Sequence, residues 1–91
     1  MFRVEFSNKA DFDYIQIWEY IADDNLFYAN EVLNKIDKSI DTICEFPFIW
    51  KDMWNNVQII VEPKYKFKIV YSVRKDYIYI LSIYKYKNDW E

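Results

Sequence analysis

The chain has 91 residues and a formal net charge of −3, and we expect residues 1–91 to form a single domain. It contains no histidine, no glycine and one cysteine, Cys44. These absences exclude glycine-rich phosphate loops, dinucleotide fingerprints, zinc sites of ordinary ligands, and Ser-His or Cys-His nucleophile pairs. We therefore expect neither a cofactor nor a metal.

The charge is unevenly distributed along the chain. Residues 1–47 carry four basic and ten acidic side chains, whereas residues 48–91 carry eight and five. Either both parts are ordinary solvated surface, or the second part attracts an anion such as nucleic acid or an acidic protein segment. Aromatic residues make up 22% of the chain, which is more ring surface than a small core requires, so some rings are expected to face a partner.

The sequence predicts a cytoplasmic protein. One cysteine allows no internal disulfide, and Cys44 is expected to be a small buried apolar group. The first ten residues, MFRVEFSNKA, lack the apolar run of a signal peptide. No eighteen uncharged apolar residues run together, so no membrane span is expected.

The first predicted elements are a strand over 2–6 and a helix over 8–21. Phe2, Val4 and Phe6 alternate with charged residues, which is the two-residue period of a half-buried strand. Ser7 or Asn8 is the expected helix cap. One face of this helix is apolar and contains Ala10, Tyr14, Ile17, Trp18 and Ile21.

A second helix is predicted over 26–46, between the capping residue Asn25 and Pro47. Glu31 and Lys35 are spaced for an i,i+4 ion pair on its polar side. Its apolar residues recur every three or four positions, at Ala29, Val32, Leu33, Ile36, Ile40 and Ile43. Two such helices are expected to pack on each other and on a sheet.

The second half of the chain is predicted to be mainly β-structure. Residues 48–56, FIWKDMWNN, show no period and are assigned to a loop, followed by a strand over 57–61. Residues 65–73 and 77–84 are expected to form a hairpin around a polar turn at 74–76. Lysines at 64, 66 and 68 alternate there with Tyr65, Phe67 and Ile69.

The last strand, YIYILSIY at 77–84, is apolar on both faces, which favours a central strand with helices on one side. Its other side lacks an evident cover, so either the tail KYKNDW or a second polypeptide is expected there. The predicted fold class is α+β, with one strand, a two-helix hairpin and a three-stranded antiparallel sheet, in the order β-α-α-β-β-β.

This order in about ninety residues resembles the RelE/ParE toxin superfamily. The similar stretches are FSNKADFDYIQIWEYIA after the first strand, Phe46-Pro47 after the second helix, and Tyr65 with FKIVYSVRKDYIYILSIYKYKNDW. The chain departs from the family pattern at Trp50, where glycine is usual, at Val57-Gln58, where arginine is usual, and at Lys87, which replaces a tail arginine.

The resemblance implies the toxin of a type II toxin–antitoxin pair, neutralised by a cognate antitoxin protein. Its target would be DNA gyrase in the ParE branch, or the ribosome with its mRNA in the RelE branch, where the toxin is a ribonuclease. We favour the ParE-like activity because basic and proton-transfer groups are sparse. A catalytically silent partner-binding domain of the same fold is the third hypothesis.

Cleavage of RNA by its own 2′-hydroxyl requires a base, an acid and positive charge at the phosphate. Free lysine and tyrosine titrate near ~10, so each would need a depressed pKa to serve at neutral pH. The lysines are also consistent with a solvent-facing edge strand and a frayed strand end. The candidates are Lys64, Lys66, Lys68, Lys85 and Lys87 for charge, and Tyr84 or Tyr86 for the proton.

The surplus of aromatic rings predicts a surface that binds the apolar face of an amphipathic antitoxin segment. Without an antitoxin, we expect the chain to associate with itself, for example as a homodimer. Trp50 and Trp54 could also pack under the long loop. The candidate partner-binding residues are Trp18, Trp50, Trp54, Tyr77, Tyr79, Tyr86 and Trp90.

Overall fold

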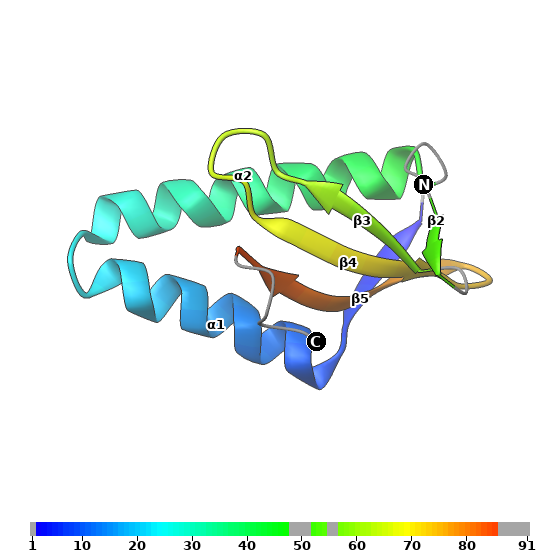
Figure 1. The fold of residues 1–91 in the computed structure, drawn as a ribbon, viewed down its shortest axis with the longest axis horizontal. Coiled ribbons are helices and arrows are strands. Elements are labelled where there is room, and N and C mark those ends of the chain that lie inside the picture. The colour runs from blue at the N-terminus through cyan, green and yellow to red at the C-terminus, as the bar shows by residue number, and fades with distance from the viewer. Residues whose placement is uncertain (1, 48–51, 55–56, 86–91) are drawn as a thin grey trace.

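The fold has two layers, a helical hairpin and a five-stranded sheet that packs on it (Figure 1). The computed structural model describes residues 2–47, 52–54 and 57–85. In chain order the elements are β1 (Arg3–Phe6), α1 (Asn8–Ala22), α2 (Leu26–Glu45), β2 (Asp52–Trp54), β3 (Val57–Val61), β4 (Lys68–Val73) and β5 (Tyr77–Tyr84).

The sheet has the strand order β1-β5-β4-β3-β2. β1 runs parallel to β5, because the helical hairpin carries the chain back across the sheet before the later strands begin. The other neighbouring pairs are antiparallel. The predicted hairpin of β4 and β5 and the internal position of β5 are confirmed.

Local side chains fix where the helices begin. The hydroxyl of Ser7 accepts a hydrogen bond from the backbone N–H of Ala10 at 3.0 Å, and Oδ1 of Asn25 accepts one from Tyr28 at 3.0 Å. Phe46 caps the end of α2, directly before Pro47. The helix boundaries predicted from the sequence are therefore confirmed.

The core lies between the helices and one face of the sheet. Ile36 and Ile43 of α2 are completely buried, as are Ile69, Tyr71 and Ile80 of the sheet. These side chains belong to one apolar cluster, which also includes Ala10 of α1. The apolar stripe of α2 thus supplies most of the buried helical side chains, whereas Ala10 is the buried residue of α1.

The predicted fold class is confirmed, and two local assignments are wrong. Residues 52–54, assigned to a loop, form the short edge strand β2, and three residues are too few to show a period. Residues 65–67, assigned to the start of the strand over 65–73, belong instead to the β3–β4 connection, which turns at 63–65, and β4 begins only at Lys68. Lys64 and Lys66 therefore do not lie on a strand.

The side chain of Glu62 explains why the strand β4 does not begin before Lys68. Its buried carboxylate accepts hydrogen bonds from the backbone N–H groups of Lys64, at 2.8 Å, and Tyr65, at 2.6 Å. Lys66 then adopts a φ of 68°, in the left-handed region that costs a non-glycine residue roughly 1 kcal/mol. A side-chain hydrogen bond of this kind leaves no periodic signal in the sequence.

The face of the sheet away from the helices is more covered than expected. On β4, Val70 and Ser72 point away from the helical layer and are buried. On β5, Tyr77 and Tyr79 are half-buried. The far face is therefore buried on β4 and half-covered on β5. The tail, one of the two covers expected for β5, lies from residue 86 on outside the described residues.

Substitution of Ile36 by alanine tests the position of the core. Ile36→Ala is expected to lower the free energy of unfolding by about 3 kcal/mol, since it leaves a cavity under a fully buried side chain. Ile15→Ala is the matched control, because Ile15 is 54% exposed, and its effect is expected to be below about 0.5 kcal/mol. Urea denaturation measures both, and equal losses would contradict this core.

Candidate partner-binding groove

A groove of about 720 Å³ lies between the helical hairpin and the end of the sheet where β4 begins and β5 ends. Buried side chains such as Ile83 and Phe67 form its base, whereas Phe12 and Tyr20 on α1 are 61% and 84% exposed. Tyr28 of α2 also lines it. Large exposed rings beside an apolar hollow are typical of a surface that binds a partner.

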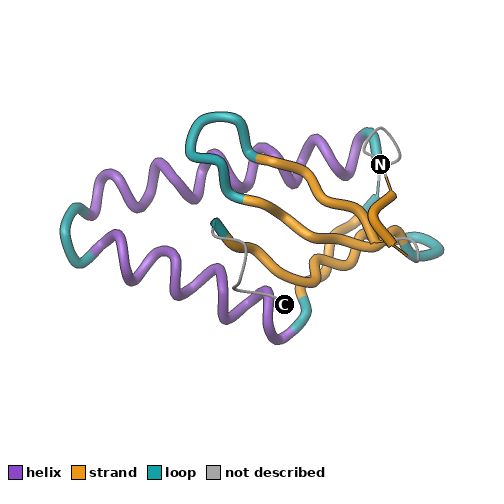
Figure 2. The backbone as a smooth tube through the Cα atoms, viewed as in Figure 1, coloured by secondary structure: helices purple, strands orange, loops and turns teal. Residues whose placement is uncertain are grey.

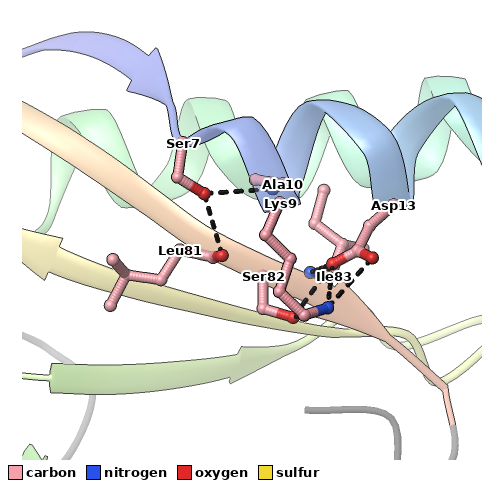
Figure 3. A network of polar contacts seen from close by, with 7 residues as sticks. All are labelled: Ser7, Lys9, Ala10, Asp13, Leu81, Ser82 and Ile83. Atoms are coloured by element: carbon pink, nitrogen blue, oxygen red, sulfur yellow. Dashed lines mark hydrogen bonds and ion pairs between the residues drawn. The ribbon is translucent and has the colours of Figure 1, made fainter.

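A polar network anchors α1 on β5 at one end of the groove (Figure 3). The carboxylate of Asp13 accepts hydrogen bonds from the Ser82 hydroxyl and the Ile83 backbone N–H, both at 3.0 Å, and pairs with Lys9 Nζ at 2.9 Å. Ser7 donates a hydrogen bond to the backbone oxygen of Leu81 at 3.0 Å. These contacts fix the first turns of α1, and with them the groove-lining residue Phe12.

A second polar cluster joins the β3–β4 turn to α2 on another side of the groove. Oε2 of Glu31 pairs with Lys64 Nζ at 2.8 Å and also accepts a hydrogen bond from the Tyr65 hydroxyl. The sequence predicted an ion pair between Glu31 and Lys35, whereas in the structure the Glu31 carboxylate is bonded to Lys64. Figure 2 shows this turn as a loop beside α2.

The pKa shifts in this cluster follow from the shared hydrogen bonds. Hydrogen bonds from Lys64 and Tyr65 lower the pKa of Glu31, and the hydrogen bond to Glu31 raises the pKa values of Lys64 and Tyr65. The raised pKa keeps Lys64 a cation, which excludes it as a base at neutral pH and leaves its charge compensated by Glu31.

The predicted catalytic residues are divided between separate parts of the structure. Tyr84 and Lys85 both line the groove, where Lys85 Nζ lies 5.6 Å from the centre of the Phe67 ring. Lys64 and Lys66 lie in the β3–β4 turn and do not line it. Lys87 lies outside the described residues.

The predicted partner-binding residues are also dispersed. Trp18 on α1 donates a hydrogen bond from Nε1 to Asn30 of α2, at 3.0 Å. Tyr77 and Tyr79 lie on the far face of the sheet, with ring centres 6.3 Å apart. The backbone of Trp54 lies in β2. Trp50, Tyr86 and Trp90 lie outside the described residues.

Sequence reasoning missed the rings that define the groove. Phe12, Tyr20 and Tyr28 were not assigned to a partner surface, because they do not belong to the apolar stripes of their helices. That departure was itself a usable signal, since a large ring off the core-facing stripe of a helix is expected to be exposed.

Two classes of site are not found among the residues that the structure describes. No group of acidic or cysteine side chains there is arranged to hold a metal ion. No helix there is long and apolar enough to cross a membrane.

Comparison with known proteins identifies the family. No curated protein sequence matches the chain. One similar solved structure is the chromosomal ParDE TA system from P. aeruginosa, with a TM-score of 0.80, 16% identity, and coverage of 96% of this chain and 98% of that chain. Another is the intact E. coli RelBE toxin–antitoxin complex, with a TM-score of 0.75, 16% identity, and coverage of 97% and 100%.

These TM-scores establish a shared fold. The family itself is shown by sequence, since the model of the family described as the ParE toxin of the type II toxin–antitoxin system parDE matches residues 4–90. The resemblance to RelE/ParE toxins is thereby confirmed, and the chain belongs to the ParE family of toxins of type II toxin–antitoxin systems.

Proposed function

We propose that residues 1–91 form a single toxin domain that inhibits DNA gyrase, and that a cognate antitoxin neutralises it by placing an apolar segment in the groove. Both proposed actions take place in the cytoplasm. The observation that carries the antitoxin proposal is the exposure of Phe12 and Tyr20 beside the buried base of the groove. Covering such rings is favourable by roughly 25 cal/mol for each Å² of apolar surface removed from water.

The chemistry of the described residues supports gyrase inhibition over RNA cleavage. A ribonuclease needs a base, an acid and cations directed at one phosphate. Lys64 is instead paired with Glu31, and neither Lys64 nor Lys66 lines the groove where Tyr84 and Lys85 lie. The family match to ParE supports the same target.

One observation favours a RelE-like ribonuclease as the second candidate. Lys68 Nζ lies 5.8 Å from the centre of the Tyr84 ring, and Lys85 follows in the chain. A ribonuclease site at the end of β5 would use these lysines as the cations at the phosphate and the Tyr84 hydroxyl as the proton donor.

Expression of the chain is expected to arrest bacterial growth, and co-expression of the short reading frame beside it is expected to restore growth. The purified chain should inhibit supercoiling of relaxed plasmid by gyrase. Mapping of mRNA ends in arrested cells should show no new cuts. New cuts that require translation, with gyrase unaffected, would replace this proposal by the ribonuclease, and unchanged growth would contradict both toxin activities.

Substitution of a groove ring tests the antitoxin site. Phe12→Ser is expected to weaken antitoxin binding by roughly tenfold or more, because it removes a large apolar anchor. Phe27→Ser is the matched control, since Phe27 is 79% exposed but does not line the groove. Isothermal titration calorimetry with purified antitoxin measures both affinities, and equal effects would place the antitoxin elsewhere.

The same pair of variants tests self-association. We propose that the free chain dimerises through its exposed groove rings. Light scattering should give a dimer for the unmodified chain and for Phe27→Ser, and a monomer for Phe12→Ser. A monomeric unmodified chain would contradict the proposed dimer.

A further inference from the structure

The contacts around Glu31 connect it to the groove, although Glu31 does not line the groove itself. Its carboxylate holds both Lys64 and Tyr65 of the β3–β4 turn, from a position on α2. Lys64 Nζ in turn lies 5.2 Å from the centre of the Tyr65 ring. One carboxylate therefore fixes two consecutive side chains of the turn.

The turn touches the groove at two points. The Tyr65 ring packs edge-on against Tyr28, with centres 5.3 Å apart and an interplanar angle of 85°, and Tyr28 lines the groove. At its other end the turn closes through a 2.7 Å hydrogen bond from the Glu62 N–H to the Phe67 oxygen, and Phe67 also lines the groove. The Tyr28 ring thus rests on a side chain of the turn, whereas the Phe67 ring is held in the apolar core.

This turn is not held in place by an intrinsically preferred backbone. Lys66 has a φ of 68° without being glycine, and such a conformation persists only where surrounding contacts impose it. The Glu62 carboxylate supplies contacts inside the turn. The Glu31 cluster supplies the contact with the helix.

We propose that Glu31, Lys64 and Tyr65 form a latch that positions the Tyr28 ring before a partner arrives. The latch lowers the ordering cost of binding, because the Tyr28 ring is already fixed when the partner enters the groove. Partner affinity then depends on a carboxylate that makes no contact with the partner. The inference rests on the groove being the partner site, but not on the cellular target of the toxin.

The test uses the full chain and anilinonaphthalene sulfonate, a fluorescent dye with an apolar ring system and one anionic group. Amide shift changes at Ile83 and Tyr84 locate the dye in the groove. The variants are Glu31→Gln, which removes the carboxylate, and Tyr65→Phe, which removes one hydroxyl and keeps the ion pair with Lys64. Glu45→Gln is the matched control, since this carboxylate on α2 bonds to no other described residue and Glu45 does not line the groove.

Glu31→Gln is expected to raise the dissociation constant of the dye roughly fivefold, and Tyr65→Phe roughly twofold, with an unfavourable change in binding entropy. Glu45→Gln should leave the dissociation constant unchanged. The double variant Glu31→Gln with Tyr65→Phe should lose little more than Glu31→Gln alone, because both changes open the same latch. The nuclear Overhauser contact between the Tyr28 and Tyr65 rings should weaken in parallel with affinity.

Three outcomes would overturn the latch. The first is unchanged dye affinity in Glu31→Gln after the contact between the two rings is lost. The second is an equal loss in Glu45→Gln, and the third is the absence of dye from the groove of the unmodified chain. If Glu31→Gln does not fold, Tyr65→Phe alone decides between the expected twofold loss and none. Failure of growth arrest or of gyrase inhibition would reject the proposed target and leave these binding results standing.

Discussion

The buried apolar cluster shared by the helical hairpin and the sheet is the contact on which the rest of the structure depends. Ile36 and Ile43 reach the buried sheet residues Ile69, Tyr71 and Ile80, which fixes the helical layer on one face of the sheet. A helix of 20 residues is about 30 Å long, whereas a six-residue strand is about 20 Å long. The hairpin therefore extends past the end of the sheet, as Figure 1 shows, and the groove lies at that end.

The sequence predicted those parts of the fold that depend on period and on helix caps. The apolar stripe of α2, its cap Asn25 and the β4–β5 hairpin are all local patterns, and the structure contains each of them. Residues 65–67 were mispredicted as strand because alternating lysines imitate a strand. The Glu62 carboxylate holds the chain in a turn here by hydrogen bonds to backbone N–H groups. Such bonds cannot be recognised from the spacing of apolar and polar residues in the sequence.

The candidate site was less predictable than the fold. Tyr84 and Lys85 were selected for chemistry and line the groove because β5 ends there. Phe12 and Tyr28 were missed, since their role depends on how far the hairpin extends beyond the sheet, which is a tertiary property. The latch was hidden for the same reason, because Glu31 and Lys64 are 33 positions apart in sequence.

The charge asymmetry of the chain is partly resolved by internal pairing. Glu31, from the acidic first half, is bonded to Lys64 from the basic second half. Both side chains remain partly exposed, so the pair itself adds little stability. The pair joins the β3–β4 turn to α2.

Methyl and aromatic NMR of the chain, titrated with its antitoxin, tests the central claim about the groove most directly. Binding in the groove predicts the largest shift changes at Phe12, Tyr20 and Tyr28, with small changes at Tyr77 and Tyr79 on the far face of the sheet. The largest changes at Tyr77 and Tyr79, with Phe12 and Tyr20 unaffected, would contradict the claim.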